Sequence, residues 1–475
     1  GHTFLRIHHP RSQMLGRKRA LIDNGIDFSA TVDTDNALIY AFKGMFGLFE
    51  GHFNRMPYFY KIREYNDYES RDLWEYDLNL THEQKLMITL HLWEVGNTWF
   101  DYYYMTENCS YHLLAVLEAS MPEVDLLTHI GPTVLPADTV KAIDKTPGLV
   151  GDIRYRPSVR KQLLARTQTM SADEKELLGL FADDPEALFP DGVEQEAQVR
   201  ILDAALDLVD FHHAKELIHE QGASESKRKQ KLMERRAEIL VPSPTIEVSP
   251  PLSKRPHLGH DSGRVGTGLL MTEGRRYAQV LDFRLSLHDL ADGPDGYPEL
   301  AQIEFLPTRL RYRYDDPGVE VDEVGLVRIV SLSPLEPFQN AISWQVDTGL
   351  VRLYDSGCPD CLVAHAAVGG GTALSWLDKA FTLYFLTDGE VYSGPNLDGI
   401  EGIPLRAGIT PEFGWRIRFH RRLIFLSSLI IFLIVSIVLT GCFPIAVSPL
   451  NIIASAPSIT EFATSFTSAL VAEKL

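Results

Sequence analysis

The strongest constraint on the fold is an alternation of apolar and polar residues that recurs after residue 257. Residues 281–288 (LDFRLSLH) place apolar side chains on one face and polar ones on the other, and residues 303–314 and 342–346 repeat the pattern. A period of two is typical of a half-buried β-strand. Several such strands with glycine-rich or acidic turns fit a barrel or a sandwich. An outer-membrane barrel has the same period, so strands facing water and strands facing lipid both stay open.

The whole chain predicts an α+β protein built from several parts. Aromatic residues are dense in the first 120 residues, where strand-like and helix-like patterns alternate, and helical polar segments follow. A Pro-rich stretch (VPSPTIEVSPPLSKRP) then marks a domain boundary. We divide the chain into residues 1–120, an enzyme-like α+β domain; 121–240, a helical region; 241–256, the Pro-rich linker; 257–420, a β-rich, barrel-like domain; 421–442, a transmembrane or signal-like hydrophobic helix; and 443–475, a poorly packed tail.

The hydrophobic segment near the end differs from the rest of the sequence. Leu423–Thr440 contains no charged residue and follows a basic flank, as in a membrane helix or an export signal. Residues 439–442 (LTGC) resemble the lipobox of a bacterial lipoprotein signal, which belongs at an N-terminus. We therefore expect that two reading frames were joined by error near residues 413–422. The alternative is that residues 423–440 form a buried helix of a soluble protein. Because the first residue is Gly1 rather than Met, we also expect a processed or truncated chain.

Composition excludes several classes of protein. Hydrophobic residues make up 45% and charged residues 23% of the chain, which excludes global disorder. Lys and Arg number 45 against 64 Asp and Glu, which gives a net charge of −19. Binding to nucleic-acid phosphates needs the opposite sign, so we expect no nucleic-acid partner.

Signals for a metal or a cofactor are weak, and we expect neither. Cys358 and Cys361 have CxxC spacing without the second pair that a zinc site needs, so a local disulfide is the favoured interpretation. The run 369–371 (GGG) lacks the Lys-Ser/Thr that follows in a phosphate loop. The other histidines show no spacing typical of metal ligands.

Cys109 is the strongest candidate for a catalytic residue in the sequence. It follows Asn108 at the predicted first turn of a helix, where free N–H groups and the helix dipole stabilise a thiolate. A nucleophilic cysteine also needs a base, and His2 lies at the start of a predicted strand. A strand-borne histidine facing such a cysteine is the papain-type arrangement. The alternative is that Cys109 is a small buried apolar residue.

A family resemblance adds to this interpretation. Five motifs occur in order: residues 1–6 (GHTFLR), 43–47 (KGMFG), 71–76 (RDLWEY), 91–94 (HLWE) and 107–111 (ENCSY). Together they resemble the Lnb N-terminal periplasmic domain family, named for a bacterial lipoprotein N-acyltransferase. The order of histidine and cysteine is also similar to circularly permuted NlpC-type thiol enzymes, which include lecithin:retinol acyltransferase.

The resemblance implies a permuted papain-like fold, with Cys109 as nucleophile and His2 as base. That acyltransferase is expected to continue into several membrane helices, whereas here a helical region and a β-rich domain follow. The resemblance therefore implies a thiol enzyme rather than lipoprotein N-acylation itself.

The third catalytic residue is expected on the strand within residues 20–30. Asp27 or Asn24 could bond the distal nitrogen of the imidazole, and we choose Asp27; both could instead only shape the turn around Gly25. Three further charged residues of the shared motifs could hold a lipid headgroup or pair with one another, and we favour pairing: Arg6, Arg71 and Glu75.

Two functions from different classes are compatible with these features. The first is a cysteine-dependent acyltransferase or hydrolase that acts through a thioester on Cys109, with a lipid, lipoprotein or peptide substrate. The second is a non-catalytic envelope or outer-membrane module with a docking β-domain. Both imply the bacterial cell envelope, in the periplasm and associated with a membrane, with the outer membrane as one option.

Overall fold

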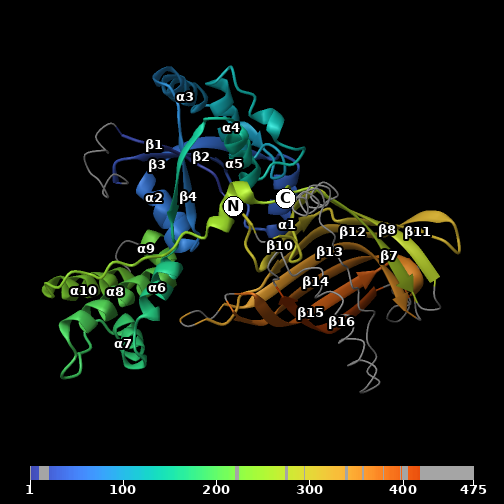
Figure 1. Ribbon diagram of the computed structural model, residues 1–475. Coiled ribbons are helices and arrows are strands. Elements are labelled where there is room, and N and C mark those ends of the chain that lie inside the picture. Colours follow the sequence, from blue (N-terminus) through green and yellow to red (C-terminus); the bar gives the residue numbers. More distant parts are fainter. Residues whose placement is uncertain are drawn as a thin grey trace, which may run out of the picture. The chain divides into compact units, whose positions relative to one another are not determined.

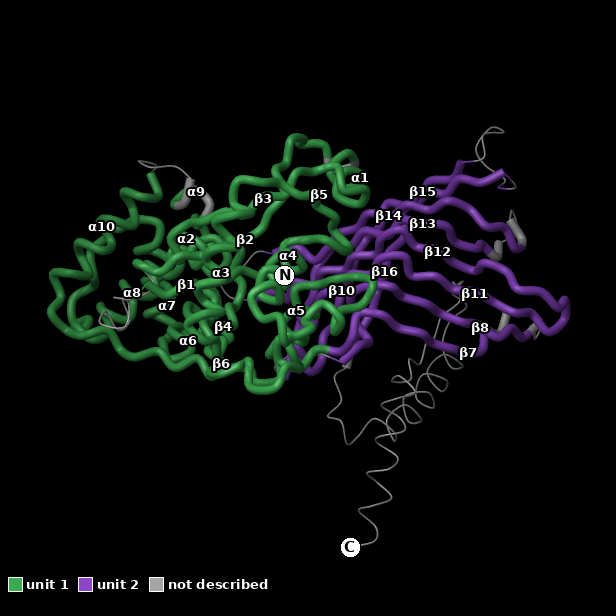
Figure 2. Tube along the Cα trace, turned by 90° about the horizontal axis from the view of Figure 1, so that it is seen from above, with its two compact units in different colours: residues 1–259 green, residues 260–475 purple. Residues whose placement is uncertain are grey.

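The computed structural model describes residues 2–9, 21–219, 224–272, 276–293, 295–336, 338, 341–355, 358–377, 379–395, 397 and 405–417. Helices and strands both make up large parts of it, as an α+β chain requires. The chain divides into two compact units, residues 1–259 and residues 260–475 (Figure 2).

The first unit is built on a four-stranded antiparallel sheet in the order β1-β2-β3-β5 (Figure 1). Its strands are β1 (Leu5–Ile7), β2 (Asn24–Ala30), β3 (Phe49–Pro57) and β5 (Phe100–Tyr102). The accompanying helices are α1 (Ala37–Met45), α2 (Tyr58–Ile62) with the π-helical turn Arg63–Tyr68, α3 (His82–Val95), α4 (Cys109–Ala119) and α5 (Pro136–Lys145), with a 3₁₀ turn at Leu127–His129.

Local capping signals in the sequence begin several helices. Thr81 caps α3 in a capping box with Gln84, and Ser171 forms a capping box with Glu174 at the start of α7 (Ala172–Asp183). The predicted second helix begins at Cys109 itself. The apolar side of α4 contributes Leu114 and Leu117 to a core cluster against which Leu5 and Phe53 of the sheet pack.

A second, two-stranded sheet pairs β4 (Leu73–Leu78) with β6 (Val150–Arg156) in antiparallel register. The period-two alternation of Trp74, Tyr76 and Leu78 with charged residues in the sequence is therefore that of strand β4. Its partner β6 lies in the region expected to be helical, because pairing with β4 outweighs the helical character of its surroundings. The helices after β6 are α6 (Val159–Gln168), α7 (Ala172–Asp183), α8 (Gln195–His212), α9 (Ala214–His219) and α10 (Ser224–Glu238), followed by short 3₁₀ turns at Leu252–Lys254 and Pro256–Leu258.

The second unit is one large antiparallel sheet, as the period-two pattern predicts. Its main path runs β16-β15-β14-β13-β12-β11-β8-β7, with β9 and β10 pairing beside it (Figure 1). The strands are β7 (Arg264–Thr272), β8 (Arg276–Arg284), β9 (Ser286–His288), β10 (Ala301–Phe305), β11 (Thr308–Arg313), β12 (Gly318–Ser331), β13 (Ser343–Asp355), β14 (Cys358–Trp376), β15 (Phe381–Ser393) and β16 (Leu405–Ile417). Closure of this sheet into a barrel stays a prediction.

The glycine run and the cysteines also have clear places in the structure. The glycine run 369–371 lies inside β14, where a Cβ on Gly371 would collide with the carbonyl oxygen of Phe385. Gly371 therefore permits the close approach of β14 to β15. Cys361 is disulfide-bonded, as a local disulfide requires, and Cys109 is free.

The hydrophobic segment Leu423–Thr440 and the tail 443–475 lie outside the described residues. In the part of the chain that is described, every helix is too short or too polar to cross a bilayer.

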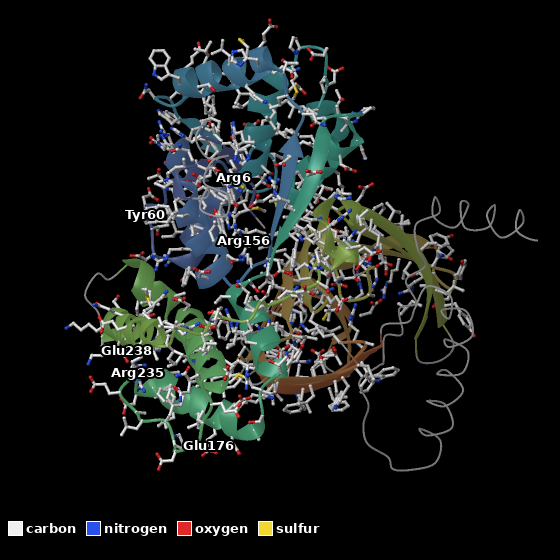
Figure 3. All side chains as sticks on the ribbon, turned by 60° about the vertical axis from the view of Figure 1, so that its left-hand side comes forward. Arg6, Tyr60, Arg156, Glu176, Arg235 and Glu238 are labelled. Atoms are coloured by element: carbon white, nitrogen blue, oxygen red, sulfur yellow. The ribbon has the colours of Figure 1, made fainter. Side chains whose placement is uncertain are left out.

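A buried ion network ties β1 to its neighbours. The Arg6 guanidinium donates to Asp23 at 2.7 Å and to Glu75 at 2.8 Å, and Tyr58 donates its hydroxyl to Glu75 at 2.6 Å. The Asp23 side chain is fully buried. Arg6 and Arg156, which both act on Glu75, lie near one another inside the unit (Figure 3). The pairing of Arg6 with Glu75 agrees with the structural interpretation of these motif residues.

We predict that Arg6→Met lowers the free energy of unfolding of the first unit by about 3 to 5 kcal/mol, because it removes the guanidinium that pairs with both Asp23 and Glu75. Chemical denaturation followed by circular dichroism measures this. Arg71→Met is the control, since among the described residues Arg71 forms its ion pair with Glu69, at a partly exposed site, and should cost less than about 1 kcal/mol. Equal losses in the two variants would contradict a structural role for the network.

Candidate functional site

Local sequence fixes the start of α4 at Cys109. The Asn108 side chain accepts hydrogen bonds from the backbone N–H groups of Ser110 at 3.1 Å and Tyr111 at 3.4 Å, which is an N-cap. Its amide nitrogen donates to the Val134 carbonyl at 2.6 Å, so the cap is anchored to a second segment. Cys109 is therefore held at the first position of an 11-residue helix, at the positive end of its dipole.

The surroundings of Cys109 are aromatic and largely closed to solvent. Cys109 is 8% exposed, and its backbone N–H donates to the Tyr102 hydroxyl at 3.4 Å. Burial and the neighbouring Cys109 thiol raise the pKa of Tyr102, so this hydroxyl stays protonated. The Tyr102 ring stacks on Phe28 with centroids 5.8 Å apart. The thiol thus lies at the edge of an aromatic cluster on the sheet.

The central strand β2 separates two environments. Asp27 and Phe28 are neighbours in β2, and successive side chains of a strand point to opposite faces. On one face Phe28 packs on His112 of α4, with centroids 4.1 Å apart. On the other face Asp27 accepts a hydrogen bond from Lys61 of α2 at 2.9 Å. Helix α4 and its cysteine therefore belong to the Phe28 face.

His2 contacts the other face. Its ring stacks on Tyr65, which follows α2, with centroids 5.1 Å apart, and Phe4 stacks on the same tyrosine at 5.6 Å. Solvent still reaches His2, yet the protein around it lowers its pKa to about 4, first by desolvation and then through positive charges that include Arg71 and Lys61. The imidazole is neutral near pH 7.

The structure brings two of the three predicted site residues to one face. His2 and Asp27 both neighbour the Lys61–Tyr65 turn, and Lys61 lies 5.1 Å from the Tyr65 ring centroid. One Asp27 oxygen, Oδ1, is buried and accepts no hydrogen bond from any described residue. Cys109 lies with Tyr102 instead, and the described interactions include no hydrogen bond between His2 and Cys109. The catalytic pairing of these two residues stays a prediction.

Sequence reasoning missed the histidine on the helix of the cysteine. His112 stands three positions after Cys109, so the two side chains share one face of α4. It is buried among Phe28, Phe53 and Phe100, and burial lowers its pKa to about 4. Its Nε2 atom has no hydrogen-bond partner in the described part of the chain. The i, i+3 spacing from Cys109 was the signal that could have found it.

A metal centre has no support in this part of the protein. The described residues contain no group of three or more His, Cys, Asp or Glu side chains placed to hold a metal ion.

We predict that the first unit loses stability as the pH falls from about 7 to 4, because of His112. A folded-state pKa near 4 lies below the ordinary value of 6.5, so the unfolded chain takes up the proton first. The stabilisation is present above pH 6.5 and lost on acidification, and amounts to about 3 kcal/mol. Urea unfolding at several pH values should show that His112→Phe removes this part of the slope. An unchanged slope would contradict a buried neutral imidazole.

Three parts of the chain match known protein families. Residues 1–146 match the model of the Lnb N-terminal periplasmic domain. Residues 153–248 and 253–429 match two domains of unknown function, DUF7842 and DUF7840. Searches of curated proteins and of solved structures found no significant match. The first match indicates a cell-envelope protein on the periplasmic side. The N-terminal part of this chain, residues 1–146, belongs to the Lnb N-terminal periplasmic domain family.

Proposed function

We propose that this protein is a periplasmic cysteine-dependent acyltransferase or hydrolase that acts through a thioester on Cys109. The observation that carries the proposal is the place of a free thiol at the first residue of α4, capped by Asn108. The N-terminus of a helix favours negative charge, including charge that develops on a side chain during a reaction. Membership of residues 1–146 in the Lnb N-terminal family supports the same class of chemistry.

The Cys109 backbone supplies a donor for the transition state. Its N–H donates to the Tyr102 hydroxyl over a long 3.4 Å, so a carbonyl oxygen of the substrate can replace that hydroxyl. As the thiolate attacks, the oxygen gains negative charge and the N–H group stabilises it. A new bond forms between sulfur and the acyl carbon, and the bond from that carbon to the leaving oxygen or nitrogen breaks.

A histidine imidazole carries the proton in the proposed mechanism. A neutral histidine takes the thiol proton and returns it to the leaving group. It then takes a proton from the acceptor amine or from water, which attacks the thioester and frees the Cys109 sulfur. Amine as acceptor gives acyl transfer, and water gives hydrolysis.

We assign the base to His2, and its neutral state near pH 7 supports this. Asp27 is the proposed orienting residue for the resting position of His2, because its Oδ1 lies on that same face of β2 and accepts no hydrogen bond from any described residue. Residues 2–4 precede β1 in an irregular segment, so His2 can leave Tyr65 without breaking a strand pairing. Reorientation of this segment toward α4 is therefore a step of the proposed mechanism.

We predict an acyl adduct on Cys109. The full chain is incubated with vesicles of phosphatidylethanolamine and phosphatidylglycerol, and peptide mass spectrometry locates the added acyl mass. Neutral hydroxylamine should remove it, as expected of a thioester. Cys109→Ser changes little volume and should leave the fold intact without this adduct. Vesicles that leave the Cys109 peptide unmodified would argue for the non-catalytic envelope module.

We also predict that His2→Ala slows modification of Cys109 by roughly 10² or more, the usual contribution of a general base. His112→Phe should change the rate less than about tenfold, because its ring packs in the aromatic cluster. Initial rates of alkylation by iodoacetamide between pH 5 and 9 test both variants. If His112→Phe were the slow variant and His2→Ala were normal, the base would be His112.

A further inference from the structure

The large sheet of the second unit carries apolar side chains on its solvent side. We call this the outer face, and define it by the alternate residues Trp344–Leu350 of β13, Ala364–Trp376 of β14, Phe381–Val391 of β15 and Leu405–Trp415 of β16. None of these alternating residues is Asp, Glu, Lys or Arg. Exposure is high at its centre, with Val368 at 64%, Phe413 at 67% and Ile409 at 79%.

The opposite face of the same sheet carries the charges. Arg328 of β12 pairs with Asp347 of β13 at 2.9 Å. The Gln345 side chain donates to Asp388 at 2.7 Å and to Glu412 at 2.8 Å, so three strands are joined by polar contacts.

Further charges continue this inner face toward β8. Arg284 is almost fully buried and pairs with Asp292 at 2.5 Å. A cavity of about 240 Å³ lies among these charged side chains and is lined by Arg284, Glu304 and Arg328. The inner face therefore combines a network of ion pairs with small apolar clusters, one of them around Leu386 and Val330.

This polarity is the reverse of that of a sheet in water. An antiparallel sheet with one wet face buries its apolar side and exposes its polar side. A contiguous exposed apolar area of this extent marks an interaction site rather than an ordinary surface. A sheet that spans a bilayer has apolar side chains toward lipid and polar ones inside, which is the arrangement of this sheet.

Aromatic residues lie at both ends of the strands. Trp344 is the second residue of β13, Trp376 ends β14, and Trp415 lies near the end of β16. Tyr277 and Tyr312 lie at the opposite end, at the start of β8 and the end of β11. Tryptophan and tyrosine prefer the two interfaces of a membrane.

The strands are also long enough to cross a lipid bilayer. Strands β13, β15 and β16 have 13 residues each, and 9 to 11 tilted residues cross the hydrocarbon core. Length, aromatic ends and inverted polarity all fit lipid better than a protein partner, which would need no such spacing of aromatic residues.

We propose that the outer face is embedded in the hydrocarbon of a lipid bilayer and anchors the second unit in a membrane. This inference goes beyond the proposed function and does not depend on the chemistry of Cys109. The edge strands β7 and β16 need partners there, because unpaired backbone groups are costly in lipid. Both edges reach the same segment: Arg264 of β7 pairs with Asp292 at 3.0 Å, and Arg416 of β16 donates to the Leu290 carbonyl at 2.9 Å. Pairing of β7 with β16 in the membrane, which would satisfy these groups, is part of this proposal.

Quenching of tryptophan fluorescence by brominated acyl chains tests the proposal. The full chain is diluted from detergent into vesicles of phosphatidylethanolamine and phosphatidylglycerol, with and without bromine on the acyl chains. We expect strong quenching that disappears when Trp344, Trp376 and Trp415 are all replaced by Phe. The matched control replaces Trp74, Trp93 and Trp99 of the first unit by Phe and should keep the quenching. Residues 423–440 contain no tryptophan, so that segment cannot produce the signal.

Arginine substitutions give a second measurement. Val368→Arg and Ile409→Arg place a charge near the middle of the outer face and should each lower the vesicle-bound fraction by more than about tenfold in flotation. Leu188→Arg is the control, at an apolar residue of the first unit that is 83% exposed, and should bind as the parent does. Quenching that survives loss of the three sheet tryptophans would overturn the proposal. A dimer that forms without lipid and is not quenched would assign the outer face to a second copy and overturn it too.

Discussion

Successive side chains of a β-strand point to opposite faces, and both units depend on this constraint. In the first unit it acts at β2. Phe28 faces α4 and the cysteine, while Asp27 faces α2, where Lys61 and Tyr65 collect. A strand that carries a buried aromatic ring and a buried ion pair on adjacent residues can only lie between two covered faces. The position of each candidate catalytic residue follows from the face to which its neighbours belong.

The same alternation gives the second unit its inverted polarity. Burial alone would lower the pKa of Arg328, but the carboxylates of Glu323, Asp347 and Glu304 raise it, so the guanidinium stays charged inside the sheet. Removing one member of such a network leaves an uncompensated buried charge. The apolar side chains of the outer face need no such partner when they contact lipid. The ion pairs therefore permit a sheet with charged side chains on its inner face and apolar side chains across its outer face. Interior charge and exterior hydrophobicity are two results of one pattern.

Features that depend on neighbouring residues were predictable from the sequence. The capping box at Thr81, the start of α4 at Cys109 and the strands after residue 257 were each encoded within a few residues. A period of two is unchanged when a sheet is turned inside out, so the pattern could not tell which face is wet. The ring that stacks on His2 belongs to Tyr65 in the π-helical turn Arg63–Tyr68, more than sixty residues away in the sequence. No pattern of neighbouring residues predicts that contact. Pairing of β6 with β4 was missed for the same reason.

The environment of His2 bears directly on the proposed chemistry. Desolvation and the nearby cations Arg71 and Lys61 hold its pKa near 4, which makes it neutral but a weak base. A catalytic base works best when its pKa lies near the working pH. Movement of residues 2–4 toward α4 would take the imidazole away from both cations and place it beside a thiol that becomes negative as it loses its proton. Each change raises the pKa of the imidazole. In the proposed mechanism, the motion that would bring His2 within reach of Cys109 would therefore also make it a stronger base.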